Sequence, residues 1–472
     1  MQEAKYRLPT TGELAFVLIG FIIVMFSFIV LFELPIQLAL LTAWFLIIAV
    51  GLKIGYTYRN LQGGLLKGIY DGLEAVLILI SVGALIGTWI AGGIVPSIIY
   101  YGLSIIHPNI FLLTAFAITT ITSIATGTSF GSAGTAGIAM MGIGASFGLP
   151  TPLVAGAVIS GAYVGDKISP LSDTTVMSAS LSKVDLIDHI KGMLPVTIPA
   201  WLITGALFLI VGIFFIEGSG ELSAAYSTMD SLEEYFNISL LMIIPAIAVV
   251  LLLALKFPSI PVILFGALLG TFWAYFFQGY TILDAVNILY SGTNIESGVT
   301  FIDELLNRGG IEFMLDVIVL IIFALGVGGL MEKIGILESL GNTLEKWATN
   351  IGRLSVSTIL SGFFGNFFGG AAYVSIITAS KITEKNYDKM NADRRLLSRN
   401  TETGGTLTTP MVPWSDGGVF MAATLGVSTL TYLPFLWFNF IAIIVGILYA
   451  YRGWYVFDSK GKEKNKVNIN TN

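Results

Sequence analysis

The sequence predicts an all-α polytopic membrane protein made of two inverted-topology repeats, each of about five transmembrane helices with re-entrant hairpins and broken helices. Three observations predict this fold class. The 472 residues are 55% hydrophobic and only 11% charged, whereas soluble proteins carry about 25% charged residues. Apolar runs of membrane-span length, about 17–25 residues, recur along the whole chain. The second half of the chain repeats polar features of the first half.

The repeat is clearest in two polar segments that interrupt apolar stretches. Residues 161–176 read GAYVGDKISPLSDTTV, and residues 405–419 read GTLTTPMVPWSDGGV. In both segments a hydroxyl residue and a proline precede a Ser-Asp pair. Internal repeats with Gly/Pro-interrupted helices are typical of secondary transporters, whose binding sites lie at such breaks.

Flanking segments match at an offset near 240 residues. Residues 68–80 align with 310–322, which pairs Glu74 with Asp316. Residues 123–136 align with 361–374, which pairs Gly127 with Gly365 and Gly131 with Gly369. A constant offset across Gly, Pro and Asp positions favours duplication over chance matching of apolar residues.

The crossings can be assigned along the chain. Clear spans are expected near 14–32, 35–52, 73–93 and 194–216. Segments 110–148 and 355–380 are expected to enter the membrane and return as re-entrant hairpins. Segment 152–181 is expected to cross once as a broken helix. Because the first half makes an odd number of crossings, the second half begins on the opposite side of the membrane and has the inverted topology.

Loop charges orient the protein. Residues 217–238 hold five acidic residues and no Lys or Arg, so this connector is expected outside, whereas 381–399 hold six basic and three acidic residues, so this loop is expected inside. Both termini are then cytoplasmic in a bacterial inner membrane. The expected organisation is a first transmembrane repeat at 1–216, an external acidic connector at 217–238, a second, inverted repeat at 239–455 and a cytoplasmic polar tail at 456–472.

Carboxylates at membrane depth are the candidate chemical groups. An ionised Asp at the bilayer centre costs about 2.5–3.5 kcal/mol on insertion scales, so it normally has a partner or a function. Asp166, Asp173, Glu402 and Asp416 are such residues, with Glu74 on a preceding helix. A buried Asp can hold a proton or a metal cation, and this competition is a simple basis for cation/proton exchange.

Hydroxyl groups and freed backbone carbonyls complete a hard-oxygen site that suits Na⁺ or Li⁺. Asp173, Asp166 and Ser172 are the Na⁺ candidates. No other metal and no cofactor is expected, because the chain has no Cys and both His fall in loops. The full set of predicted ion- and substrate-binding residues is Asp166, Ser169, Asp173, Thr174, Thr128, Ser129, Glu402, Thr406, Ser415 and Asp416.

At GDKISPLSDTT (165–175) the sequence resembles the NhaC family of sodium/proton antiporters, and the block at 401–427 supports this resemblance. The resemblance implies a bacterial inner-membrane exchanger of the ion-transporter type. It implies ion-site roles for Asp166, Ser169, Asp173 and Thr174, with Glu402, Thr406 and Asp416 from the second half. The family resembles, and includes, sodium-coupled malate/lactate exchangers, which the motif does not separate from Na⁺/H⁺ antiporters.

Two transport functions stay open on the sequence. The first is antiport of Na⁺ (or Li⁺) against H⁺, and the alternative is Na⁺/H⁺-coupled exchange of small organic acids of the malate/lactate type. An enzyme is disfavoured, because Lys167 is the only basic residue expected at depth. A channel is disfavoured, because channels more naturally use rings of repeated chains than an internal duplication. The expected partners are Na⁺, H⁺, the lipid bilayer and, in the alternative, small carboxylates. No nucleic-acid partner is expected, and a homodimer stays open.

Overall fold

The computed structural model describes residues 6–215, 218–294, 306–307 and 309–455, and these residues form helices and no β-strand. The predicted all-α polytopic class is confirmed. The helices of the first half are α1 (Thr11–Phe26, with a π-helical continuation at Ser27–Leu31), α2 (Ile36–Ile54), α3 (Tyr58–Asp71), α4 (Leu73–Ala91), α5 (Ile94–Ile105), α6 (Pro108–Thr126), α7 (Ser129–Ser132), α8 (Ile138–Ser146), α9 (Thr151–Ile168), α10 (Asp173–Leu181), α11 (Leu186–Phe215) and α12 (Gly218–Tyr235).

The second half continues with helices of similar lengths. They are α13 (Ile244–Ala254), α14 (Ser259–Phe277), α15 (Ile282–Ser291), α17 (Leu315–Lys333), α18 (Ile336–Trp347), α19 (Ile351–Gly369), α20 (Ala372–Lys389), α21 (Arg394–Gly405), α22 (Asp416–Leu425), α23 (Thr429–Tyr432) and α24 (Trp437–Arg452). The predicted polar tail at 456–472 and part of the predicted acidic connector lie outside the described residues.

Seven helices among the described residues are long and apolar enough to cross a membrane, or nine if two bent pairs each count as one span. The four clear spans expected in the first half correspond to α1 with its continuation, α2, α4 and α11. The ten crossings expected from the sequence exceed this number. One reason is that α9, counted as a crossing, carries Asp166 and Lys167 in its last turn.

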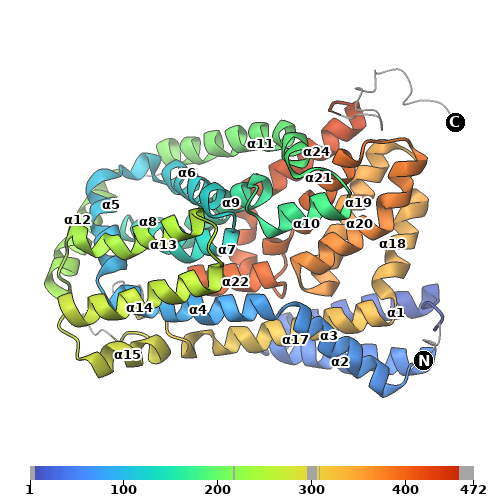
Figure 1. The fold of residues 1–472 in the computed structure, drawn as a ribbon, viewed down its shortest axis with the longest axis horizontal. Coiled ribbons are helices and arrows are strands. Elements are labelled where there is room, and N and C mark those ends of the chain that lie inside the picture. The colour runs from blue at the N-terminus through green and yellow to red at the C-terminus, as the bar shows by residue number, and fades with distance from the viewer. Residues whose placement is uncertain (1–5, 216–217, 295–305, 308, 456–472) are drawn as a thin grey trace.

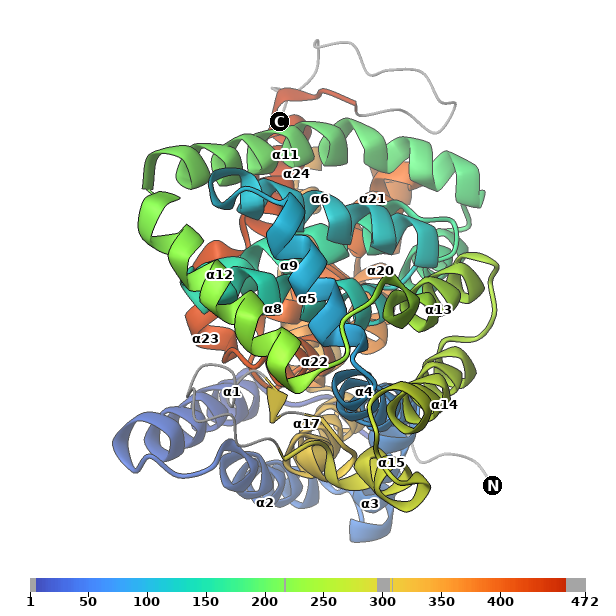
Figure 2. The same cartoon turned by 90° about the vertical axis from the view of Figure 1, so that its left-hand side faces the viewer.

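The helices lie largely parallel to the long axis of the molecule, and the start of α1 and the end of α24 lie at the same end of it (Figure 1). Viewed along that axis, α1, α2, α3, α15 and α17 form one group and α6, α9, α11 and α24 lie on the other side, with α4 and α14 between them (Figure 2). Glycines allow close backbone contacts within each group. A Cβ at Gly68 would lie 2.5 Å from the Leu325 carbonyl oxygen, between α3 and α17.

The helix order repeats along the chain. Helices α4 and α17 have 19 residues each, α5 and α18 have 12 each, and α6 and α19 have 19 each. Glu74 and Asp316 both occupy the second position of their helices. Repetition of the order agrees with a duplication, and the inverted relation of the halves stays a prediction.

The predicted pairing of Gly127 with Gly365 is wrong by five residues. Gly127 ends α6 with φ of +73°, and the residue that ends α19 in the same way is Gly370, with φ of +72°. Gly365 lies inside α19. The segment GFFGNFFGG offers several glycines to align, and only the backbone conformation identifies the one that terminates the helix. Helices α19 and α20, with 19 and 18 residues, also make this hairpin longer than expected.

Candidate functional site

The first predicted break separates α9 from α10. Ser169 has an extended backbone (φ −73°, ψ 132°), as expected for a residue before proline, and Pro170 has no N–H to continue the helix. Ser172 caps α10, because its Oγ accepts a hydrogen bond from the Thr175 N–H at 3.4 Å. The four residues between the helices therefore interrupt the helix between Asp166 and Asp173.

The turn after α6 is packed against this break. The Ser169 Oγ donates to the Ile124 carbonyl at 2.9 Å. A Cβ at Gly127 would lie 2.4 Å from the Leu171 Cβ, so only glycine fits the turn. This contact places Thr128 and Ser129, which begin the next helix, close to the end of α9.

Asp166 is the centre of a hydroxyl cluster. Its carboxylate accepts hydrogen bonds from the Ser129 Oγ at 2.6 Å and the Ser172 Oγ at 2.7 Å, with the Thr174 Oγ1 at 3.4 Å. The Thr175 Oγ1 donates to the Asp166 backbone carbonyl at 2.8 Å. Asp166 is 7% exposed, so hydroxyls from both sides of the break replace most of the water around it.

Glu402 has a matching cluster on the second half. Its carboxylate accepts from the Ser178 Oγ at 2.5 Å, the Thr406 Oγ1 at 2.7 Å and the Thr174 Oγ1 at 3.1 Å. Thr174 therefore stands between Glu402 and Asp166. Lys167 is fully buried beside them and donates from Nζ to the Thr403 Oγ1 at 2.7 Å. The two halves of the chain meet through these polar contacts.

The second predicted break separates α21 from α22 and uses different partners. The Asp416 carboxylate accepts from the backbone N–H of Gly417 at 2.7 Å and of Ala372 at 3.3 Å. The Asp416 N–H donates to the Gly370 carbonyl at 2.8 Å. Ser415 caps α22 and donates to the Thr409 carbonyl at 2.5 Å. Asp416 thus ties the break to the first turn of α20, where a negative charge is favourable.

An inner cavity of about 80 Å³ lies between the breaks and the two helices α4 and α14. Four carboxylates line it: Glu74, Asp166, Asp173 and Asp416. Its hydroxyl-bearing lining residues are Thr128, Ser129, Tyr163, Thr174, Ser259, Tyr373, Thr406 and Thr409. Among the described lining residues there is no Lys, Arg or His. The cavity therefore offers oxygen ligands and negative charge.

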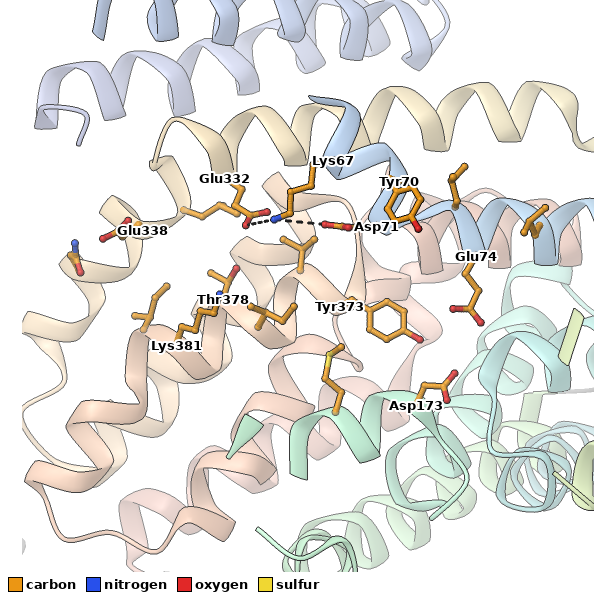
Figure 3. A pocket seen from close by; sticks show the side chains of 18 of the residues that line it. Lys67, Tyr70, Asp71, Glu74, Asp173, Glu332, Glu338, Tyr373, Thr378 and Lys381 are labelled. Atoms are coloured by element: carbon orange, nitrogen blue, oxygen red, sulfur yellow. Dashed lines mark hydrogen bonds and ion pairs between the residues drawn. The ribbon is translucent and has the colours of Figure 1, made fainter. Parts of the chain in front are cut away.

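A larger vestibule of about 1220 Å³ adjoins the inner cavity, and Glu74, Asp173 and Tyr373 line both. Figure 3 shows these three side chains pointing into the same space from α4, α10 and α20. Farther out, Lys67 bridges Glu332 at 3.2 Å and Asp71 at 3.9 Å. Glu74, Asp173 and Tyr373 thus stand between an open chamber and a small polar one.

Most of the predicted site residues gather at these two clusters. Asp166, Asp173, Thr128, Ser129, Thr174, Thr406 and Asp416 line the inner cavity. Glu402 and Ser172 lie directly behind it, bonded to lining residues. Ser169 and Ser415 line neither chamber, and their hydroxyls bond backbone carbonyls of the breaks.

Three hydroxyl-bearing lining residues were not singled out from the sequence: Tyr163, Tyr373 and Ser259. Tyr163 lies three residues before Asp166 on α9, so helical spacing places it on the same face. Tyr373 follows the turn that ends α19, and finding it required the correct pairing of Gly370 with Gly127. Ser259 at the start of α14 has no sequence signal that connects it with the breaks.

The chain is similar to named transport proteins over most of its length. A family model described as "Na+/H+ antiporter family" matches residues 6–191 and 161–454. The chain is 53% identical over 454 residues to the "Malate-2H(+)/Na(+)-lactate antiporter" of Bacillus subtilis, covering 96% of this chain and 97% of that protein. It is 37% identical to the "Na(+)/H(+) antiporter NhaC" of Alkalihalophilus pseudofirmus, covering 88% and 89%.

A third relative broadens the set of cargoes. The chain is 33% identical to the "Arginine/ornithine antiporter ArcD" of Halobacterium salinarum, over 98% of this chain and 95% of that protein. The names of these relatives thus include inorganic ions, organic acids and amino acids. The family resemblance predicted from the two motifs is confirmed, and the chain belongs to the Na⁺/H⁺ antiporter family.

Proposed function

We propose that this protein is a secondary active antiporter that exchanges Na⁺ (or Li⁺) for H⁺ across a bacterial inner membrane, with Asp166 as the carboxylate that holds either ion. The observation that carries the proposal is the lining of the inner cavity: four carboxylates, several hydroxyls and no basic side chain among the described residues. Membership of the Na⁺/H⁺ antiporter family supports it.

Competition at Asp166 couples the two ions. When Asp166 is protonated, the carboxyl group can donate to a neighbouring hydroxyl. When the proton leaves, hydroxyls such as those of Ser129 and Ser172 can rotate and turn oxygen lone pairs toward Na⁺. Asp173, the first residue of α10 after the break, supplies a further charge at the boundary of the inner cavity and vestibule. Binding of one ion then requires release of the other.

The vestibule indicates which side is open. Lys67, Lys381 and Lys385 line it, and basic residues in membrane proteins concentrate on the cytoplasmic side. We therefore assign the vestibule to the cytoplasm, both chain termini to the same side, and the structure to an inward-facing state. The position of the start of α1 and the end of α24 at one end of the molecule supports this assignment (Figure 1).

Carriage of a small organic acid is the second candidate function. The 53% identity to a protein named as a malate/lactate antiporter favours it, and the vestibule has ample volume for such a molecule. Because the inner cavity contains four carboxylates, an organic acid that reaches it requires H⁺ or Na⁺ to neutralise the combined charge. The same ion site then serves both candidate functions.

A reconstitution experiment separates the two. Liposomes with purified protein and an internal pH dye receive Na⁺, Li⁺, malate or lactate. A pH response to Na⁺ alone that is absent in Asp166→Asn supports Na⁺/H⁺ exchange. A response that requires malate or lactate supports the organic-acid function. Wild-type liposomes that respond to none of the four would contradict both.

A further inference from the structure

We propose that Tyr373 determines which solutes pass from the vestibule into the inner cavity: its ring excludes organic molecules, and its hydroxyl binds a small cation on its way through. This inference rests on the proposed function and deepens it by assigning a specificity-determining residue. Among the described residues, Glu74, Asp173 and Tyr373 line both chambers. The first two are carboxylates, so the ring of Tyr373 is the bulky uncharged group at this boundary.

The two chambers differ greatly in volume. The vestibule has about 1220 Å³ and the inner cavity about 80 Å³. The inner cavity thus has about half the volume of an engineered cavity of about 150 Å³ that holds one benzene molecule. Lactate has as many non-hydrogen atoms as benzene, so it fits the vestibule and not the inner cavity. In this state the inner cavity accepts a cation or a few water-sized groups.

The backbone that carries Tyr373 is held on both sides. Tyr373 is the second residue of α20, and the N–H of the preceding Ala372 donates to the Asp416 carboxylate at 3.3 Å. On the other side, a Cβ at Gly365 in α19 would lie 2.5 Å from the Ser375 Cα, so the two helices are in close backbone contact there. The ring of Tyr373 therefore projects from a fixed position at the boundary.

The Tyr373 hydroxyl points toward the space between Glu74 and Asp173 (Figure 3). All four carboxylates of the inner cavity interact electrostatically with Tyr373. Among the described residues, no group hydrogen-bonds this hydroxyl. A phenolic hydroxyl carries one hydrogen and oxygen lone pairs. It can therefore offer a lone pair to a cation while the neighbouring carboxylates supply the negative charge.

The order of the groups defines a path for the cation. A cation that leaves the vestibule first meets Glu74, Asp173 and Tyr373, which line both chambers, and then Asp166, which lines the inner cavity alone. Removal of the Tyr373 ring would join the two chambers into one space. Larger solutes can then compete with Na⁺ for the inner carboxylates.

Competition by an organic cation tests the exclusion. Tetramethylammonium is nearly as bulky as lactate and has no acidic proton, so it does not itself change the pH inside liposomes. Na⁺-dependent H⁺ exchange by reconstituted protein is recorded at graded Na⁺ concentrations, with and without tetramethylammonium. We expect no effect on the wild type. In Tyr373→Ala the half-saturating Na⁺ concentration should rise in proportion to the tetramethylammonium concentration.

Tyr70→Ala is the matched control, because Tyr70 lines the vestibule and not the inner cavity. This variant should stay insensitive to tetramethylammonium. Tyr373→Phe separates the two roles, since it keeps the ring and removes the hydroxyl. It should also be insensitive to tetramethylammonium, with a half-saturating Na⁺ concentration about fivefold higher, the value of one typical hydrogen bond.

A cysteine variant gives a rescue experiment. The chain contains no Cys, so Tyr373→Cys introduces its single thiol. This variant should be sensitive to tetramethylammonium. Attachment of a benzyl group through a disulfide replaces the missing ring and should abolish that sensitivity. Because the rescue acts on protein that is already folded, it distinguishes exclusion by the ring from a loss of structure.

The outcomes separate this inference from the proposed function. A wild type without Na⁺-dependent H⁺ exchange contradicts the proposed function. A wild type that exchanges these ions, while Tyr373→Ala and Tyr373→Cys are as insensitive to tetramethylammonium as the wild type, overturns the inference alone. Competition by tetramethylammonium in the wild type would also overturn it, and an unchanged Na⁺ dependence in Tyr373→Phe would remove the role of the hydroxyl.

Discussion

The break between α9 and α10 and the break between α21 and α22 share a Ser-Asp pair, yet the buried carboxylates at the two breaks, Asp166 and Asp416, have different partners. Asp166, beside the first break, accepts hydrogen bonds from hydroxyl groups. Asp416, in the second, accepts from backbone N–H groups. A hydroxyl can rotate and present a lone pair instead of its hydrogen, whereas a backbone N–H cannot. The first carboxylate is therefore suited to exchange of ions, and the second to holding helices together.

The second break is also more firmly anchored. Trp414 is 8% exposed, donates from Nε1 to the Phe367 carbonyl at 2.6 Å and packs edge-on against Phe21 at 5.7 Å between ring centroids. The first break has no such aromatic anchor in its sequence ISPLSD. The two copies of the Ser-Asp motif therefore differ in the groups that hold them in place.

Removing each carboxylate should give the largest difference between the breaks. Asp166→Asn is expected to lower Na⁺-dependent transport by about 100-fold, because loss of a buried charge partner is worth about 3 kcal/mol. Asp416→Asn keeps an acceptor oxygen for one backbone N–H and should lower transport less than about threefold, with a lower melting temperature. Flux in liposomes and thermal unfolding in detergent measure both. Equal loss of flux in the two variants would erase the proposed distinction.

The turns beside the breaks should differ in stability. Gly127→Ala places a Cβ 2.4 Å from the Leu171 Cβ at a positive φ, whereas the nearest atom to a Cβ at Gly370 is 3.1 Å away. We expect Gly127→Ala to lower the free energy of unfolding by about 3 kcal/mol and Gly370→Ala by about 1 kcal/mol. Both variants place a Cβ on a left-handed backbone, and only Gly127→Ala also creates a severe clash. Melting temperatures in the same detergent rank the two variants, and the reverse order would show that the first turn is the more adaptable.

The capping serines provide a matched pair. Ser172→Ala and Ser415→Ala each remove an N-cap worth about 1 kcal/mol, so similar losses of stability are expected. Only Ser172 also bonds Asp166. Its replacement should therefore shift the half-saturating Na⁺ concentration by about tenfold, the value of one hydrogen bond to a charged group. An unchanged Na⁺ dependence in Ser172→Ala would place the ion away from this hydroxyl.

An ion pair between α20 and the start of α21 should have the smallest effect. The Arg394 guanidinium, 2.5 Å from Glu384, holds the pKa of this carboxyl below its usual 4.5, with Lys183 contributing. The stabilisation is present above pH 4.5 and is lost as the pH falls through the lowered pKa. Arg394→Gln should cost less than about 1 kcal/mol near neutral pH and leave Na⁺-dependent flux unchanged. A change in flux would connect this ion pair with the ion site.

Much of the site could be predicted from the sequence because the polar residues stand out against apolar helices. Asp166, Thr174 and Glu402 were identified in this way, and the structure brings them together. The sequence does not distinguish Asp166 from Asp416, because the difference lies in hydroxyl versus backbone partners. Tyr373 and the Gly370 turn required the backbone conformation, since small and aromatic residues around α19 allow several alignments.

The most direct test of the exchange role of Asp166 is an infrared difference spectrum of the purified protein, recorded with and without Na⁺. Replacement of a proton by Na⁺ removes the carbonyl stretch of a protonated carboxyl group and adds that of a carboxylate. The account predicts this change in the wild type and in Asp416→Asn, and its loss in Asp166→Asn. A spectrum that keeps the change in Asp166→Asn and loses it in Asp416→Asn would contradict the account.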